Sequence, residues 1–433
     1  MHGSDGATAL LDLNGLRVGA HELVDDEWWL LVETTADVVG CSRCGARAVG
    51  HGRRRVQVRD VPIAGRPVRL VWSKRLWRCP DRDCASGTWS ETHPAIAPRS
   101  SLTLRAKEMI CRRVGRDGAS VAQVAVEFGV GWHAAMSAVT EIGQPLVDDP
   151  ARLGAPSALG LDETSYLRAN ATHPRVMVTG FADLDRHVLL DVEPGRSGGV
   201  VRDWLDHRET EWLASIEVAV VDPFRGYANA LVDRLPDATI VVDHFHAVRL
   251  GNQAIDDVRR RVQQQTLGHR GRAHDPLYRI RKLLLVAHER LTEPQQERLI
   301  RLIGLGDRDG EVAAAYLAKE LLREVYAARR LSWARARLRR FYRHCDRSGV
   351  PECRRLAKTI RAWEDEVLAF HATGRSNGPT EGINLLIKKI KRVGHGFRNF
   401  INYRLRLLLH CGGVEWQTPA TTRVRGRQPR FAA

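Results

Sequence analysis

The chain has 433 residues, of which 43% are hydrophobic, and is long enough for two to four globular domains. Its formal net charge of +16 favours a polyanionic partner, with nucleic acid the leading candidate, although high arginine content also arises from coding bias. No run of 18 apolar residues is present, and the N-terminus lacks the basic flank and apolar core of a signal peptide. The sequence therefore argues against a membrane span and predicts a protein of the reducing cytoplasm.

Four of the eight cysteines form a pattern. Cys41 and Cys44 make one close pair, Cys79 and Cys84 make another, and the segment between the pairs alternates apolar and basic residues at strand period. Two such pairs fit a tetrahedral zinc site of ribbon type, which would hold together a module too small for a strong core; unrelated free thiols are the alternative. We therefore predict a strand-rich zinc-binding module over residues 1–98. The other cysteines are interpreted as buried hydrophobic residues without disulfides: Cys111, Cys345, Cys353 and Cys411.

Residues 101–143 have the pattern of three short helices. Ser120 can cap the segment "VAQVAVEF", Gly129 breaks it, and "WHAAMSAVTEIG" follows after a short turn. The apolar spacing equally fits a plain three-helix bundle. The Arg-rich flanks and the adjacent zinc module favour a helix-turn-helix DNA-binding domain over residues 99–150, with Trp132 and His133 at the start of the DNA-contacting helix.

A linker with Pro and Gly near residues 148–156 precedes a segment with the order β-β-β-α-β-α-β-α. Three strands can form a meander, and the later strands alternate with helices, so residues 151–250 predict a mixed α/β sheet. Residues 251–373 are helical and basic, with a capping box at Thr292 and Gln295, and are interpreted as an insertion. We assign residues 374–412 to a second part of the core and 413–433 to a loose basic tail. A helix from Pro379 should bury one face, formed by Ile383, Leu386, Ile387, Ile390 and Val393.

Two aspartates follow buried apolar runs: Asp162 after "ALGL" and Asp222 after "VAVV". The carboxyl ends of such strands gather at one edge of a sheet, where unpaired carboxylates are costly and a divalent cation is their natural partner. Glu381, in the first turn of the helix from Pro379, is the third acid that a two-metal site would need. A simple favourable interaction with the helix dipole is the alternative role for Glu381. Glu163 should face away from Asp162, because neighbouring residues of a strand point to opposite sides.

Four segments carry a resemblance to a known family: "GLDE" (160–163), "VVDPFRGY" (220–227), "VVDHFHAV" (241–248) and "SNGPTEGINLLIKKIKRVGHGFRN" (376–399). With these, nearly the whole chain resembles the ISL3 (ISL-three) family of bacterial insertion-sequence transposases. The resemblance implies an α/β fold whose RNase H-like mixed sheet core is interrupted by a helical insertion and preceded by a zinc-ribbon-like module and a helix-turn-helix. It also implies a DDE triad of Asp162, Asp222 and Glu381 that binds two Mg²⁺ or Mn²⁺ ions, and one zinc ion on the two cysteine pairs.

Further residues are expected to support this site. Asp243, His244 and His246 end another strand nearby and should support the fold or hydrogen-bond to the metal ligands, with a direct catalytic role for Asp243 or His244 left open. Asn384, one turn after Glu381, should orient that acid or the substrate. Trp204 is expected in the core. Contacts with the DNA backbone are expected from Arg225, Tyr227, Lys388, Lys391, Arg392 and Arg398.

The predicted function is that of a DNA transposase that binds the terminal inverted repeats of its insertion sequence. It should hydrolyse a phosphodiester at each end and direct the released 3′ hydroxyl at target DNA. Its partners would be element ends and target DNA, and the assembly on DNA a homodimer or larger. The alternatives are a sequence-specific DNA-binding regulator or inactive derivative, against which the three acids argue, and a structure-selective nuclease, against which the two N-terminal modules argue.

Overall fold

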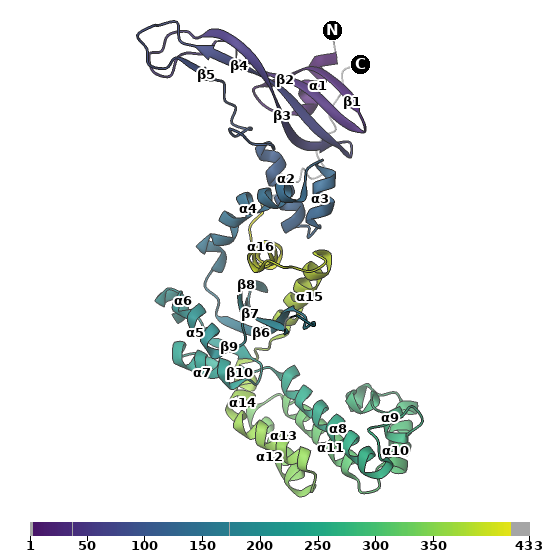
Figure 1. Cartoon of the computed structure of the whole chain (residues 1–433). Coiled ribbons are helices and arrows are strands. Elements are labelled where there is room, and N and C mark those ends of the chain that lie inside the picture. The colour runs from purple at the N-terminus through teal and green to yellow at the C-terminus, as the bar shows by residue number, and fades with distance from the viewer. Residues whose placement is uncertain (1–2, 37, 173, 417–433) are drawn as a thin grey trace, which may run out of the picture. The chain divides into compact units, whose positions relative to one another are not determined.

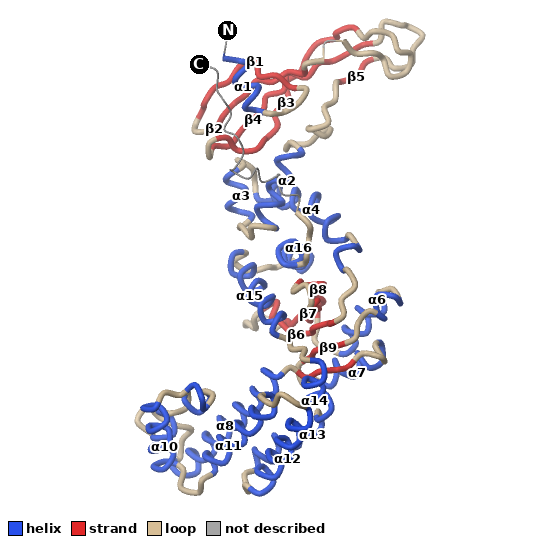
Figure 2. The backbone as a smooth tube through the Cα atoms, turned by 180° about the vertical axis from the view of Figure 1, so that it is seen from behind, coloured by secondary structure: helices blue, strands red, loops and turns tan. Residues whose placement is uncertain are grey.

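The computed structural model describes residues 3–36, 38–172 and 174–416 (Figures 1 and 2). The chain divides into two compact units, one formed by Met1–Arg152 with Leu386–Ala433 and the other by Leu153–Leu385. Of the predicted basic tail at 413–433, residues from 417 onward lie outside the described residues. Within the described ranges, no helix combines the length and the apolar character that crossing a bilayer requires.

The first unit contains a five-stranded sheet with one helix against it. Its strands have the order β1-β2-β4-β3, and β5 pairs with β4 beyond the part of β4 that pairs with β2. Leu11 of α1 joins a core of apolar residues from β1 to β4 and Ile96, in which Val32, Val68 and Leu70 are fully buried. The sequence did not indicate α1. The elements are α1 (Gly3–Leu11), β1 (Leu16–Val24), β2 (Glu27–Thr34), β3 (Val49–Ile63), β4 (Arg66–Arg78) and β5 (Thr88–Ser90).

Helices of the same unit follow the sheet: α2 (Leu104–Gly115), α3 (Val121–Glu127), α4 (Trp132–Asp148) and, from the C-terminal end, α16 (Phe400–Cys411). As predicted, the Ser120 side chain caps α3 by accepting a hydrogen bond from the Gln123 N–H, and Gly129 follows α3 at φ 61°. A Cβ at Gly143 of α4 would lie 2.8 Å from the Leu409 side chain of α16. Residues 400–411, which the sequence assigned to the catalytic core, therefore pack beside α4 in the first unit.

The second unit contains a mixed five-stranded sheet with the order β10-β9-β6-β7-β8. Strands β6, β7 and β8 are antiparallel neighbours, whereas β6, β9 and β10 are parallel. The predicted order of strands and helices is confirmed, with one additional short helix, α6. The elements are β6 (Ala158–Leu167), β7 (Val176–Asp183), β8 (Val188–Pro194), α5 (Gly198–Asp206), α6 (Thr210–Ala214), β9 (Val218–Val221), α7 (Arg225–Arg234) and β10 (Thr239–Val242).

Both faces of this sheet are buried, which explains the unbroken apolar runs of β9 and β10. Ala219 and Val221 pack with Trp204 of α5, which lies in the core as predicted. Val218 and Val220 point to the other face, where Phe370 packs against them. The alternation follows from the two-residue period of a strand.

Residues 244–373 are mainly helical, as predicted (Figure 1). Their apolar side chains share one large core. α8 and α11 lie side by side in both views (Figures 1 and 2). The capping box of Thr292 and Gln295 is present at the start of α10. The helices are α8 (His244–Leu267), α9 (Pro276–Arg279), α10 (Glu293–Gly306), α11 (Glu311–Tyr326), α12 (Leu331–Arg347), α13 (Pro351–Ala362), α14 (Glu364–Thr373) and α15 (Gly378–Val393), with short 3-10 helices at Pro150–Leu153, Leu283–Leu285 and His288–Arg290.

The apolar stripe of α15 is largely buried. Ile383, Ile387 and Ile390 are at most 2% exposed, as their spacing predicted. Leu386 is 38% exposed, so its expected place on the buried face was wrong. Leu386 lies at the edge of the stripe, about 60° around the helix from its centre, and its side chain reaches solvent there. The buried stripe is therefore narrower than expected.

Candidate functional site

Asp162 lies on β6, and Asp222 directly follows the neighbouring parallel strand β9. Gly160 of β6 pairs with Val220 of β9, and each aspartate follows two residues later. Two residues along a strand return a side chain to the same face, so both carboxylates point to the same side of the sheet. Their carboxylate oxygens and a ring nitrogen of His246 lie within 4.8 Å of one another. The structure thus brings the two predicted aspartates together.

The two carboxylates share a partly buried, electrostatically costly position. Burial, with the nearby charge of Asp222, raises the pKa of Asp162 above its ordinary value, although hydrogen bonds from the Glu163 N–H and Asn384 oppose this effect. Oδ1 of Asp222 is buried and lies against the ring of His246. Two carboxylates held this close together in a partly buried position favour the binding of a cation.

His246 connects Asp222 to Asp243. Its Nδ1 lies 2.7 Å from Asp222 Oδ1 and makes a 3.1 Å hydrogen bond with Asp243 Oδ2. Burial opposes protonation of this histidine, but its contacts with Asp222 and Asp243 raise its pKa to about 10. The sequence favoured His244 over His246 for a direct role, whereas the structure places His246 beside the aspartates. The position along α8 distinguishes the two histidines. His246 is the third residue of the helix, and a side chain there points back toward the start of the helix.

Asp243 caps the start of α8 and is not an exposed acid. Its side chain accepts hydrogen bonds from the backbone N–H groups of Phe245 and His246, and its Oδ1 accepts one from the Asn377 N–H at 2.9 Å. Although burial opposes its charge, hydrogen bonds from His246 and Asn377 lower the pKa of Asp243. The supporting role that the sequence suggested for Asp243 therefore has a specific geometry: it joins α8 to the segment that begins α15.

Asn377 attaches the start of α15 to β6, a role that sequence reasoning missed. The Asn377 side-chain amide donates to the Leu161 carbonyl at 3.1 Å, and its oxygen accepts from the Thr380 hydroxyl at 2.5 Å. Both side chains are at most 3% exposed. Gly160 allows this close approach, since a Cβ there would lie 2.6 Å from Thr380 Oγ1 and 2.7 Å from Asn377 Oδ1.

We expect Gly160→Ala to destabilise the second unit by about 1–3 kcal/mol, because the added methyl group overpacks this contact. Gly304→Ala is the matched control: nothing lies within 4 Å of its Cβ position on α10, so it should be neutral or stabilising by up to about 1 kcal/mol. Urea unfolding of both variants measures the difference. Equal midpoints would show that α15 does not depend on a glycine at this position.

Asn384 and Glu381, one turn apart on α15, occupy different environments. The Asn384 side-chain amide donates a hydrogen bond to Asp162 Oδ2. Glu381 is exposed and lies outside the cluster formed by Asp162, Asp222 and His246. The structure therefore brings Asn384 into contact with the aspartates. Glu381 lies one helical turn before Asn384 and does not make this contact.

The remaining residues proposed around the sheet edge have identifiable partners. Glu163 faces away from the cluster, as expected, and its Oε1 lies 2.7 Å from Arg196 Nε. Arg225 pairs with Glu366 at 2.7 Å and stacks on Trp363, so it supports the fold in this state. Tyr227 is fully buried and hydrogen-bonds to Thr179 at 2.7 Å. Contact between Tyr227 and DNA is thus excluded by this burial.

His244 is half-buried and packs against the rings of Tyr326 and Phe370.

The residues proposed to bind DNA in the first unit are mostly exposed. Trp132 and His133 form the first turn of α4, and their rings meet edge to face at 5.2 Å. Trp132 is 44% exposed, which is unusual for a tryptophan that only stabilises a core. The predicted basic residues in and after α15 are exposed except Lys391, which is half-buried; they are Lys388, Lys391, Arg392 and Arg398.

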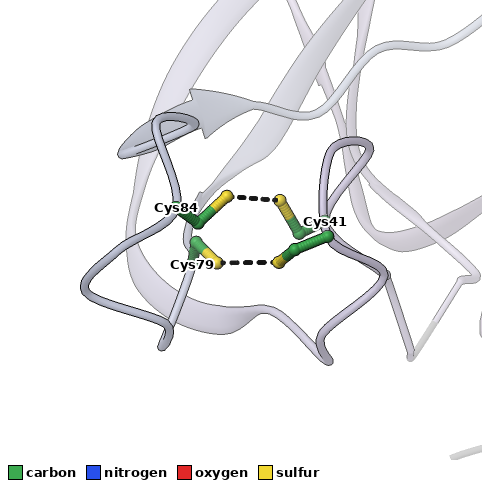
Figure 3. A group of neighbouring side chains, drawn as sticks. Cys41, Cys79 and Cys84 are labelled. Atoms are coloured by element: carbon green, nitrogen blue, oxygen red, sulfur yellow. Dashed lines mark hydrogen bonds between the residues drawn. The ribbon is translucent and has the colours of Figure 1, made fainter.

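The four predicted zinc ligands converge at one end of the first sheet (Figure 3). Cys41 Sγ lies 3.7 Å from Cys84 Sγ, and Cys44 Sγ lies 3.5 Å from Cys79 Sγ. A tetrahedron with zinc–sulfur bonds of about 2.3 Å has edges of about 3.8 Å, so the sulfurs are almost at ligand spacing. Hydrogen bonds from Ser86 and from backbone N–H groups lower the pKa of Cys41 to about 6, which favours a thiolate.

Comparison with known proteins identifies the family of the chain. Residues 159–407 match a family model described as transposase, of the DDE type named for ISL3, and residues 37–84 match the zinc finger of the IS204/IS1001/IS1096/IS1165 transposases. The chain is 26% identical over 384 residues to the transposase for insertion sequence element IS1001 of Bordetella parapertussis, covering 86% of this chain and 88% of that relative. It is 28% identical over 261 residues to the transposase for IS1557 of Mycobacterium tuberculosis, covering 56% and 57%. The chain therefore belongs to the ISL3 family of DDE transposases, with an N-terminal zinc ribbon.

Proposed function

We propose that this transposase recognises the terminal inverted repeats of its own element and cuts the DNA there at an RNase H-like site formed by Asp162, Asp222 and Glu381. The observation that carries the proposal is the pairing of β6 with β9, which brings the carboxylates of Asp162 and Asp222 together in one cluster with His246. The antiparallel meander followed by two parallel strands supports the RNase H-like assignment.

The residues present fit divalent cations. The donor set is rich in carboxylate oxygen, which Mg²⁺ and Mn²⁺ prefer, and the neighbouring carboxylates of Asp162 and Asp222 lie in a partly buried position where their charges repel. When bound, two such ions would activate the attacking oxygen and stabilise the leaving oxygen of the phosphodiester. Asp162 and Asp222 would hold the ions from the sheet.

The protein's own side chains prepare this site in three ways. Asn384 holds one oxygen of Asp162 by a hydrogen bond, which leaves the other directed at the Glu163 N–H. His246 fixes the position of Asp222 from the start of α8. Glu381 completes the ligand set from α15: its exposed side chain is free to turn toward the aspartates once cation and DNA are present.

DNA recognition would come from the N-terminal modules. α3 and α4 have the lengths and the glycine-containing turn of a helix-turn-helix, and exposed Trp132 and His133 begin its second helix. Cutting two ends in one reaction needs two active sites, so we propose at least a homodimer on DNA.

The decisive experiment compares cleavage by the native protein and by Glu381→Gln. The substrates are labelled duplexes from the two ends of the element that encodes the protein, incubated with Mg²⁺ or with EDTA. We expect nicking at a defined end position only with Mg²⁺, reduced about 10²-fold or more in Glu381→Gln, because two to three kcal/mol of transition-state stabilisation would be lost. Glu297→Gln, at an exposed position of α10, is the matched control and should cut normally.

Two results would contradict the proposal. Normal cutting by Glu381→Gln would remove Glu381 from the ligand set and favour Asp162, Asp222 and His246 as the complete site. Specific binding of the element ends without cutting by either protein would indicate a regulator or an inactive derivative.

A further inference from the structure

Helices α12 and α13 carry a strongly basic surface outside the candidate active site. Nine cationic side chains of these two helices are exposed, against one exposed acid, Asp346. The only other acid of the two helices, Glu352, is buried. The exposed cations are Arg335, Arg339, Arg340, Arg343, Arg347, Arg354, Arg355, Lys358 and Arg361.

The cations of α12 form a regular stripe. Arg335, Arg339, Arg343 and Arg347 recur every four residues, so they lie on one side of the helix over a length of about 18 Å. The stripe continues onto α13, since Arg339 and Arg343 line the same surface groove as Arg361. The two helices therefore present one continuous basic surface.

Most of these cations have no side-chain partner among the residues that the structure describes. Ion pairs involve Arg340 with Glu324, Arg355 with Glu352, and Arg361 with Asp346. The side chains of the other six make no ion pair or hydrogen bond with any residue in the described ranges. We call these six residues the α12–α13 arginine surface: Arg335, Arg339, Arg343, Arg347, Arg354 and Lys358.

A stabilising role does not explain the α12–α13 arginine surface. Elsewhere in this helical region, arginines with a structural role are paired: Arg261 contacts Glu311 and Glu352, and Arg323 contacts Glu289 and Glu320. Like charges one helical turn apart repel each other and destabilise a helix. The free protein therefore carries a surface that only an anionic partner would neutralise.

We propose that the α12–α13 arginine surface binds the phosphate backbone of duplex DNA. The guanidinium group matches phosphate geometry and stays charged at every physiological pH. At about 3.4 Å per base pair along the axis, the 18 Å stripe spans about five base pairs, which is enough for several phosphates. The exposed aromatic residue of the two helices, Trp333, lies in the first turn of α12 and faces the guanidinium group of Arg330. The arginine surface itself therefore offers phosphate contacts and holds DNA without reading its sequence. This inference rests on the proposed function, to which it adds a contact site within the helical insertion.

The test uses the full-length triple variant Arg339→Gln, Arg343→Gln, Arg347→Gln and a scrambled-sequence duplex. Affinity is measured by fluorescence anisotropy over a range of salt concentrations. We expect the slope of log K against log salt to become less negative by about 2.7, since each lost phosphate contact removes about 0.9. The matched control, Arg298→Gln, Arg301→Gln, Arg308→Gln, removes the same charge from exposed positions in and after α10 and should keep the native slope.

Two further readouts separate this inference from the proposed function. The triple variant should keep the native preference for element ends over scrambled duplex, because it leaves the N-terminal modules intact, and its melting temperature should be equal or higher, since repulsion is relieved. An unchanged slope in the triple variant, or an equal change of slope in the control, would overturn the inference. So would a triple variant that binds single-stranded DNA more weakly but binds the duplex as the native protein does. Absence of Mg²⁺-dependent cutting by the native protein would count against the proposed function and would leave the slope result valid.

Discussion

Replacing Asp222 by Asn should reduce Mg²⁺-dependent cutting of the element ends by about 10³-fold or more. Asn keeps the shape of the side chain and removes the charge of a partly buried acid that lies 2.7 Å from His246 and beside Asp162. A lost metal ligand costs several kcal/mol of transition-state stabilisation, and each 1.36 kcal/mol is tenfold in rate. Single-turnover cleavage of labelled duplexes measures the effect.

Binding of the element ends should be retained in Asp222→Asn, because the N-terminal modules are unchanged. Asp233→Asn is the control: this aspartate is half-exposed on α7 and pairs with Arg202 at 3.2 Å, an interaction worth little. Its cutting rate should match that of the native protein. Cutting by Asp222→Asn within tenfold of the native rate would show that Asp222 is not a metal ligand.

Replacing Cys79 by Ser should reduce bound zinc from about one ion per chain to near zero, and removal of zinc by a strong chelator should have the same structural effect. Zinc binding supplies about 10–16 kcal/mol of apparent free energy in zinc-finger peptides, so loss of one thiolate removes most of the stabilisation of the metal loops. Metal analysis and hydrogen exchange measure the two consequences. We expect faster exchange in residues 39–48 and 79–88.

The rest of the sheet should stay protected, because β1 to β4 share an apolar core that includes none of the four cysteines. Cys353→Ala, in a buried position of α13, is the control and should retain its zinc. Full zinc content in Cys79→Ser would contradict the assignment of Cys79 as a ligand. Unfolding of the whole sheet on chelation would show that the apolar core is insufficient without the metal.

The sequence by itself determined the features that depend on short-range spacing. Two cysteine pairs, the cap at Ser120, the capping box at Thr292 and the order of strands around Asp162 and Asp222 are all local patterns, and the structure contains each of them. The sequence also predicted that Asp162 and Asp222 lie at the same edge of the sheet, because the carboxyl ends of parallel strands meet there.

Only the tertiary structure decided which side chains contact the aspartates. Asn377 joins α15 to β6 across 216 residues of sequence, and His246 lies between two acids because Asp243 caps α8. These contacts arise from packing between distant segments, which leaves no periodic signal in the chain. The same reason explains Tyr227, which the sequence proposed for DNA contact but which is buried and hydrogen-bonds to Thr179 of β7. It also explains Glu381, whose side chain the fold leaves exposed one turn from Asn384.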